Sequence, residues 1–118
     1  MRWTLVFIHK PLWTYAGSDG PEGQAAYAFW SQVETMLQGR KHTAYAGHFH
    51  TYNKHRRGQA NYFVLATTGG GSQLRGSAFG EFDHVVWITM TDHGPRMANL
   101  LLDGIADENI RVAENAEH

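Results

Sequence analysis

The pattern of apolar and polar positions predicts one strand, one helix and then a series of short strands. Residues 3–9 form a short and almost continuous apolar run, which is typical of a strand that is buried on both faces. Lys10 and Pro11 end this run, because proline has no N–H to donate to a sheet. This order of elements favours an α/β or α+β fold with one main amphipathic helix and a mixed or antiparallel sheet.

The segment between Pro21 and Gly39 is expected to be the helix. Its apolar residues recur at spacings of three and four and so mark one helix face, made of Ala26, Phe29, Trp30, Val33, Met36 and Leu37. Asp19 and Glu22 have the spacing of a capping box, with Pro21 in the first turn. Gly39 is expected to end the helix in the left-handed conformation. We interpret the aromatic pair on this face as core packing.

Short apolar segments in the rest of the chain predict four strands, at residues 43–46, 62–67, 82–91 and 96–102. The last two are separated by a short turn that contains His93 and are expected to pair as an antiparallel hairpin. Residues 1–105 are therefore assigned to one domain. The polar residues 106–118 are expected to be a tail or a short helix.

The composition restricts the class of protein without identifying its activity. Hydrophobic residues make up 42% of the 118 positions and charged residues 18%, which excludes a disordered chain. The absence of cysteine excludes disulfides, thiolate metal sites and cysteine nucleophiles. No apolar run approaches the roughly 20 residues of a membrane-spanning helix, so no membrane partner is expected.

The net charge of −1 conceals an asymmetry between the two halves of the chain. Residues 1–60 hold seven Lys/Arg and three Asp/Glu, a net charge of +4, whereas residues 61–118 hold three and eight, a net charge of −5. Lys54, Arg56 and Arg57 form a basic cluster that is either a solvated loop or a cationic rim that attracts an anionic substrate. A duplex-binding surface needs a wider basic stripe, so no nucleic-acid partner is expected.

Candidate chemistry concentrates at three histidines. His48 and His50 are two positions apart, so in extended backbone both side chains leave on the same face. His9 ends the first predicted strand. Neutral imidazole is a ligand for zinc, iron and manganese, and two imidazoles on one face serve one metal ion or two adjacent ions.

The remaining histidines show no ligand spacing. His42 and His55 are interpreted as exposed loop residues, His84 as a packed or hydrogen-bonded strand residue, and His93 as part of a turn.

Two segments in this order resemble motifs of the calcineurin-like metallophosphoesterases, purple acid phosphatases among them. The first is Val-Phe-Ile-His-Lys-Pro-Leu-Trp at residues 6–13, and the second is Tyr-Ala-Gly-His-Phe-His-Thr-Tyr at residues 45–52. The resemblance extends over residues 2–105. It implies the C-terminal part of an αββα sandwich in which two packed sheets carry helices outside.

The resemblance also implies roles for the three histidines. His9 and His48 would ligate one metal ion and His50 its neighbour, in a pair of Fe, Mn or Zn ions that hydrolyses phosphate esters. Lys54, Arg56 and Arg57 would then help to hold the substrate.

The other motifs of that family are missing from the chain. It contains no Asp-x-His, Gly-Asp or Gly-Asn-His, which supply the bridging carboxylate, the asparagine ligand and the catalytic histidine. The chain is therefore expected to be an inactive C-terminal part that binds one metal weakly or none. It is also expected to self-associate through an exposed sheet edge. The alternative is a stand-alone, non-catalytic α/β interaction domain with structural histidines or a single bound metal.

Overall fold

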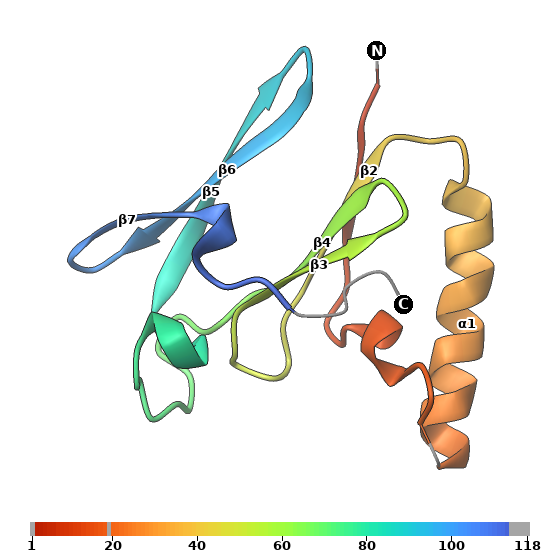
Figure 1. The fold of residues 1–118 in the computed structure, drawn as a ribbon, viewed down its shortest axis with the longest axis horizontal. Helices are drawn as coiled ribbons and strands as arrows, with labels where there is room; N and C mark the ends of the chain where they lie inside the picture. The colour runs from red at the N-terminus through yellow and green to blue at the C-terminus, as the bar shows by residue number, and fades with distance from the viewer. Residues whose placement is uncertain (1, 19, 114–118) are drawn as a thin grey trace.

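The computed structural model describes residues 2–18 and 20–113 and shows an α+β fold with two sheets (Figure 1). The first sheet is mixed and has the order β1-β2-β4-β3, formed by β1 (Thr4–Phe7), β2 (His42–Ala46), β4 (Ala60–Val64) and β3 (Asn53–Arg57). The second sheet is antiparallel and consists of β5 (His84–Thr91), β6 (Gly94–Leu101) and β7 (Gly104–Asp107). The predicted fold class is confirmed.

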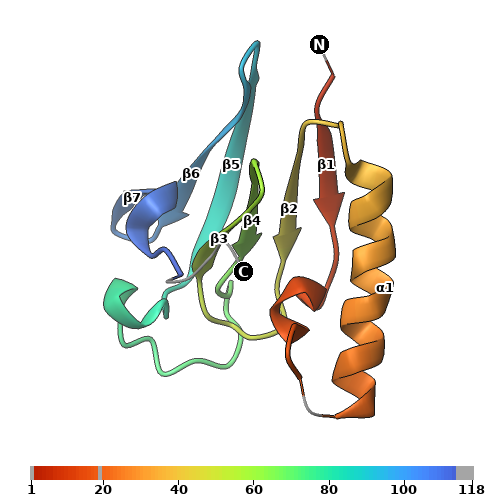
Figure 2. The same cartoon turned by 45° about the vertical axis from the view of Figure 1, so that its right-hand side comes forward.

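Helix α1 (Pro21–Leu37) and the 3₁₀ helix η1 (Leu12–Tyr15) cover one face of the first sheet, and the second sheet packs on the other face (Figure 2). Trp13, Trp30 and Tyr62 fill the space between helix and sheet. Phe63 and Met97 belong to the separate core between the two sheets. The first sheet is thus the central layer, so both of its faces are covered and its exposed side chains lie along its borders.

The predicted helix is confirmed, but its start and its buried face differ from expectation. The N-cap is Gly20 without a side-chain cap, so the expected capping box is wrong, and Asp19 lies outside the described residues. Gly39 does adopt a left-handed φ of 80°. Trp30 is buried, whereas Phe29 is 59% exposed, because the sheet covers a narrower stripe of the helix than its apolar face. The assignment of Phe29 to the core is therefore wrong.

The first strand is present, but the expectation that it is buried on both faces is wrong. β1 is the outermost strand of its sheet, where it pairs only with β2 among the described strands. Phe7 stacks on Tyr45 with ring centroids 5.5 Å apart and is nevertheless 67% exposed. No described strand pairs with the outer edge of this strand.

The basic segment after the histidines is strand β3 and not a loop, as it pairs antiparallel with β4 from Asn53 to Arg57. Charged residues are common on edge strands because they prevent edge-to-edge pairing, and this context was not evident from the local sequence. His55 and His42 are consequently not exposed loop residues. His55 is half-buried near the Trp13 ring, and His42 begins β2.

The β5–β6 hairpin is confirmed, with His93 in its turn. The prediction that His84 is a packed strand residue is also confirmed. The 3₁₀ helix η2 (Ser77–Phe79) lies in the connection that precedes β5. None of the described helices is long and apolar enough to cross a membrane.

Strand β7 crosses the boundary expected at residue 105, and the 3₁₀ helix η3 (Glu108–Ile110) follows it. The backbone beyond η3 then returns to the first sheet. The Lys54 N–H donates to the Arg111 carbonyl at 3.0 Å, and the Ala113 N–H donates to the Lys54 carbonyl at 2.8 Å. Residues 114–118 lie outside the described residues.

Candidate metal-binding histidines at the carboxyl edge of the first sheet

His9 and His48 follow the carboxyl ends of two neighbouring parallel strands. Phe7 of β1 is in register with Tyr45 of β2. The ladder continues beyond this pair, because the Gly47 N–H donates to the His9 carbonyl at 2.8 Å. Loops at the carboxyl ends of parallel strands meet at one edge of a sheet, which is where such sheets place their ligands. The fold therefore brings the two histidines together from positions 39 residues apart.

The two imidazoles are in direct contact at this edge. Nδ1 of His48 lies 3.1 Å from Nε2 of His9, and the rings meet edge to face with centroids 5.0 Å apart. Both side chains are exposed to solvent. One of these ring nitrogens donates an N–H hydrogen bond and the other accepts it.

The backbone that carries the second motif is left-handed and not extended. His48 has a φ of 76° and His50 a φ of 58°, so the expectation of an extended His-x-His segment is wrong. Left-handed conformations cost non-glycine residues roughly 1–2 kcal/mol each. Such strain persists only where the surroundings fix it, and it is concentrated at functional sites.

Tyr52 anchors the far end of this strained loop. Its side chain is fully buried, its N–H donates to the Gly80 carbonyl at 2.7 Å, and its hydroxyl donates to the Glu108 carbonyl at 2.6 Å. The loop is thus fixed on one side by strand β2 and on the other by Tyr52.

His50 is oriented by the glycine-rich loop that follows β4. Its Nδ1 lies 2.7 Å from the Gly71 carbonyl, and because a carbonyl only accepts, Nδ1 carries the proton. The lone pair of the neutral ring is then on Nε2. Metal-binding histidines are commonly held in this way, with the other ring nitrogen donating to a backbone carbonyl.

Gly70 allows this loop to approach His50. A Cβ atom at position 70 would clash with the Thr67 hydroxyl and would lie 3.3 Å from Cε1 of His50. This supporting residue was not identified from the sequence. The three consecutive glycines at residues 69–71 were the available signal for a close backbone approach.

The surroundings of His48 disfavour its charged form. Partial loss of solvation lowers the pKa of His48, and the neighbouring His9, Lys10 and His50 side chains lower it further. Neutral imidazole is the form that binds a metal ion.

The donor set fits part of a metal site but not a complete one. Two nitrogens bound to a tetrahedral zinc at 2.0–2.1 Å lie about 3.3 Å apart, which is close to the separation between His9 and His48. However, no group of three or more His, Asp or Glu side chains in the described part of the chain is arranged to hold a metal ion. The described residues thus place two imidazoles in contact, and the third, His50, is oriented separately.

The three basic side chains expected near the substrate are engaged elsewhere. Lys54 forms an ion pair with Glu108 at 2.7 Å, and Arg56 donates to Asn61 at 3.0 Å. Arg57 lies four residues along β3 from Asn53, which is the end of that strand nearer the histidines. This separation is about 13 Å and places Arg57 near the start of β4, away from the carboxyl ends of the parallel strands. The fold therefore does not bring Arg57 to the histidines.

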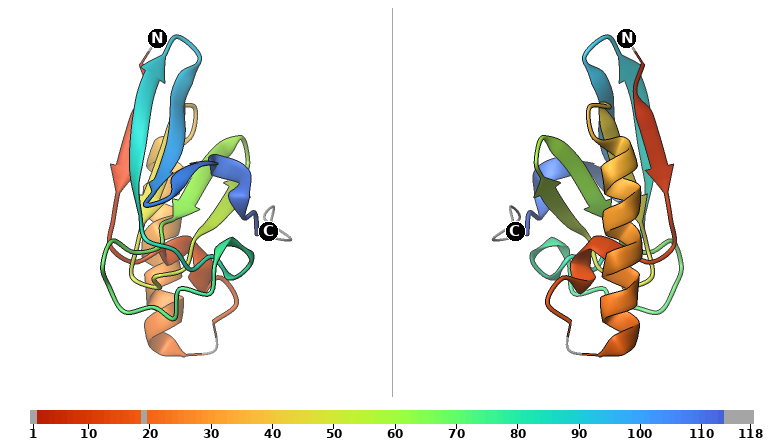
Figure 3. Two further views of the ribbon diagram at one scale, coloured as in Figure 1. Left: turned by 90° about the vertical axis from the view of Figure 1, so that its left-hand side faces the viewer. Right: turned by 90° about the vertical axis from the view of Figure 1, so that its right-hand side faces the viewer.

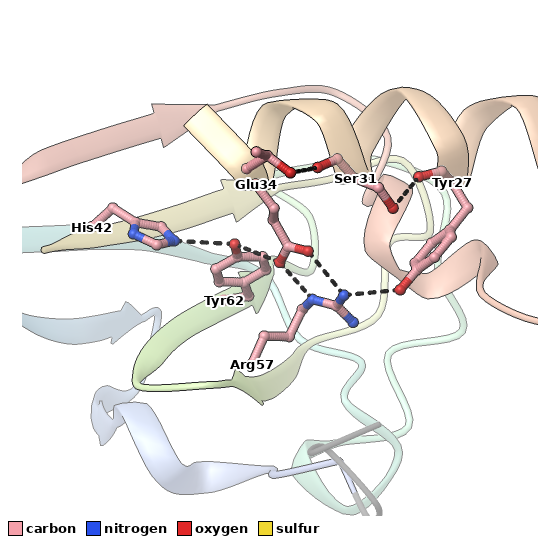
Figure 4. Close-up of polar contacts among 7 residues, drawn as sticks. Tyr27, Ser31, Glu34, His42, Arg57 and Tyr62 are labelled. Carbon is pink, nitrogen blue, oxygen red and sulfur yellow. Dashed lines mark hydrogen bonds and ion pairs between the residues drawn. The ribbon is translucent and has the colours of Figure 1, made fainter. Parts of the chain in front are cut away.

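Arg57 belongs to a second polar cluster between α1 and the first sheet (Figure 4). It forms an ion pair with Glu34 at 2.7 Å and donates to the Tyr27 hydroxyl at 3.0 Å. The Tyr62 hydroxyl donates to the same carboxylate at 2.8 Å and also lies 3.1 Å from Nε2 of His42. These contacts connect the helix to three strands.

Burial and pairing have opposite effects on the pKa values in this cluster. Burial alone would raise the pKa of Glu34, but the hydrogen bonds from Arg57 and Tyr62 outweigh it and lower that pKa. Burial and the donated bond to Glu34 both raise the pKa of Tyr62. The cluster borders a cavity of about 650 Å³ at the amino edge of the sheet. Because its charges satisfy one another, we assign it a structural role.

A comparison of the chain with models of protein families, with curated proteins and with solved structures found no match.

Proposed function

We propose that this chain carries the histidine half of a binuclear metallophosphoesterase site and is the C-terminal part of such an enzyme. The supporting observation is the approach of His48 Nδ1 to within 3.1 Å of His9 Nε2. These two histidines belong to the two motifs that resemble the family. Their contact occurs at the sheet edge where ligands of parallel strands are usually held.

Each histidine has a distinct part in the proposed site. His9 and His48 would hold one ion. His50, whose Nδ1 is fixed by the Gly71 carbonyl, would offer Nε2 to a second ion. Bound ions of this kind polarise a phosphate ester and supply a metal-activated hydroxide.

A complete site needs groups that the described residues do not contribute. Two dications about 4 Å apart repel each other, and neutral imidazoles carry no charge to offset that repulsion. Lys10, next to His9, adds a further positive charge at this edge. We therefore expect this chain to bind a single ion weakly and to show no phosphoesterase activity unless carboxylates are supplied from outside the described residues.

Metal titration tests the proposed ligands directly. Isothermal titration of the chain with Zn²⁺ and with Mn²⁺ should show weak binding of one equivalent that His48→Ala removes. His93→Ala is the matched control, because that residue lies in the hairpin turn and should leave binding unchanged. Equal binding by the native chain and the His48→Ala variant would contradict the proposal.

The phosphoesterase assignment has a separate test. The coding sequence upstream of Met1 should contain Asp-x-His and Gly-Asn-His, and a chain extended to include them should hydrolyse p-nitrophenyl phosphate or bis(p-nitrophenyl) phosphate. The 118-residue chain assayed in parallel should not. An extended chain that remains inactive with Fe, Mn and Zn would contradict the assignment.

The alternative is a stand-alone interaction domain in which the histidines are structural or hold one ion. The engagement of Lys54 by Glu108 and of Arg57 by Glu34 favours it, because neither cation is then available to a substrate in this arrangement. Tight binding of a single zinc would support this alternative over the phosphoesterase assignment, since a partial site binds weakly.

A further inference from the structure

Strand β5 is eight residues long and has an unpaired edge. The His84 N–H donates to the Thr67 carbonyl at 2.9 Å, so the backbone groups of His84 face away from β6. Backbone groups alternate sides along an antiparallel strand, so those of Val86, Ile88 and Met90 face the same way. No described strand pairs with this edge, since β5 is the outermost strand in the order β5-β6-β7. Three N–H and three C=O groups are thus directed outward.

The composition of this edge is unusual for a strand that faces water. Residues 85–91 contain no charged residue and no proline, and they are rich in β-branched and aromatic side chains. Proteins normally protect exposed edges with charges, proline or bulges. Strand β3, at the edge of the first sheet, shows this protection in its lysine and arginine side chains. β5 has none of these features, which indicates that its edge is covered by another strand.

The unpaired edge of β1 lies on the same side of the molecule as that of β5, as the two views in Figure 3 show. Phe7 of β1 and Val85 of β5 both line a cavity of about 320 Å³ between the sheets. Phe7 is 67% exposed and Val85 60% exposed. One side of the molecule therefore combines two free strand edges with an apolar opening between them.

We propose that this side is an interface between two copies of the chain, joined by antiparallel pairing of β5 with its symmetry mate. A strand that pairs with itself around a two-fold axis must be complementary to its own reversed sequence. The segment 85–91 meets this requirement because it holds no like charges to repel each other. Self-pairing also places β-branched and aromatic residues opposite one another, which are favourable cross-strand partners. The two three-stranded sheets then become one six-stranded sheet.

The exposed apolar area on this side is sufficient for such a dimer. A standard interface buries about 800 Å² per partner, of which about 57%, or roughly 450 Å², is apolar. Phe7 is 67% exposed and Trp87 63% exposed, which corresponds to roughly 300 Å² for the two aromatic side chains. Val85 and Met90, 60% and 52% exposed, raise the total to roughly 500 Å². The exposed area thus matches what one partner contributes.

The oligomeric state tests the proposal. Sedimentation velocity of the 118-residue chain over a range of concentrations should show a dimer that dissociates on dilution. Trp87→Lys introduces a charge on an exposed β5 side chain and should give a monomer. Leu102→Lys is the matched control, because Leu102 is 95% exposed in the turn after β6 and should leave the dimer intact. A native chain that is monomeric at every concentration overturns the proposal. The same result is expected if a segment of a longer chain, and not a second copy, covers this edge.

Amide exchange locates the contact on β5. The N–H groups of Val86, Ile88 and Met90 have no partner within the described chain, so their protection requires the second copy. Exchange of these amides should slow at least about tenfold as the dimer forms. Met90→Pro should abolish the dimer and the protection of the Val86 and Ile88 amides while retaining the fold, because it removes an N–H that makes no internal bond. A dimer in which these three amides exchange freely overturns the proposal.

Discussion

Nδ1 of His48 lies 3.1 Å from Nε2 of His9, and only the pairing of β1 with β2 makes this contact possible. Each histidine follows a separate parallel strand, and the hydrogen bond from the Gly47 N–H to the His9 carbonyl fixes their relative position along the strand direction. The candidate site therefore depends on the sheet register, and variants that disturb its support should affect metal binding more than folding.

The loop that orients His50 provides the first prediction. Gly70→Ala would place a methyl group against the Thr67 hydroxyl and near the His50 ring, so Thr67, the loop or the ring must shift and the bond from Nδ1 to the Gly71 carbonyl should weaken. We expect the His50 ring to lose its preference for the proton on Nδ1, which NMR of the ring nitrogens measures, while the single ion proposed at His9 and His48 should bind as before. Gly71→Ala is the control, because nothing lies within 4 Å of a Cβ there. A His50 ring that keeps its proton on Nδ1 in Gly70→Ala as it does in Gly71→Ala would show that the loop does not orient this side chain.

Helix α1 provides a matched pair of aromatic variants. Trp30 is 1% exposed and packs against Trp13 and Tyr62, so Trp30→Ala should lower the free energy of unfolding by about 3–5 kcal/mol. Phe29, its neighbour in sequence, is 59% exposed, and Phe29→Ala should change that free energy by less than about 0.5 kcal/mol. Urea denaturation measures both. Similar losses in the two variants would mean that the exposed face of the helix is covered in solution.

The ion pair between α1 and β3 should contribute to stability. Glu34→Gln leaves Arg57 without its charged partner, and we expect a loss of about 1–3 kcal/mol, below the value for a fully buried pair because both side chains are partly exposed. Glu22→Gln removes the same charge from an exposed position of the same helix and should cost less than about 0.5 kcal/mol. The comparison requires chemical denaturation at pH 7. A loss no larger in Glu34→Gln than in Glu22→Gln would contradict a stabilising role for this pair.

The buried histidine of β5 should make stability depend on pH. Its Nε2 accepts from the Ala66 N–H at 3.0 Å, so the neutral ring donates from Nδ1 to Asn99 at 2.9 Å. Burial lowers the pKa of His84 despite the opposing effects of Asn99 and Asp83. The folded state disfavours the charged ring. The contribution of the neutral ring to the free energy of unfolding is therefore complete above about pH 6.5 and declines as the pH falls below that value.

The free energy of unfolding should fall by up to about 1.4 kcal/mol per pH unit for each buried histidine whose pKa is lowered. Half-buried His55, whose pKa is lowered by burial and by Arg57, should add to it. Denaturation curves from pH 7.5 to pH 5 measure this slope, which His84→Gln should reduce and His93→Gln, in the hairpin turn, should not. An unchanged slope in His84→Gln would assign the pH dependence to other groups.

Several elements were predictable because they depend on neighbouring residues. The three- and four-residue spacing of apolar residues identified α1, and the left-handed Gly39 follows from the tendency of helices to end at glycine. The apolar alternation and the short turn identified the hairpin of β5 and β6. The three histidines were also selected by local motifs. The sequence could therefore name the candidate ligands and most of the elements that carry them.

Other features depended on contacts between distant segments. The basic residues 53–57 become a strand because β4 provides their hydrogen-bonding partners, and Phe29 is exposed because the sheet covers only part of the helix face. Arg57 is directed to Glu34, 23 positions away, and not to the histidines. No local pattern contains this information, because each of these outcomes depends on which segment occupies the adjacent space.

The sequence by itself determined the α+β class, the main helix, the hairpin and the identity of the candidate ligands, since these follow from local periodicity and turn chemistry. The tertiary structure decided that His9 and His48 are in contact, that the backbone of His48 and His50 is left-handed, and that β1 and β5 have unpaired edges. The physical reason is that strand pairing and register are set by long-range hydrogen bonds and packing. The local sequence identifies the candidate side chains, but these long-range contacts fix their positions.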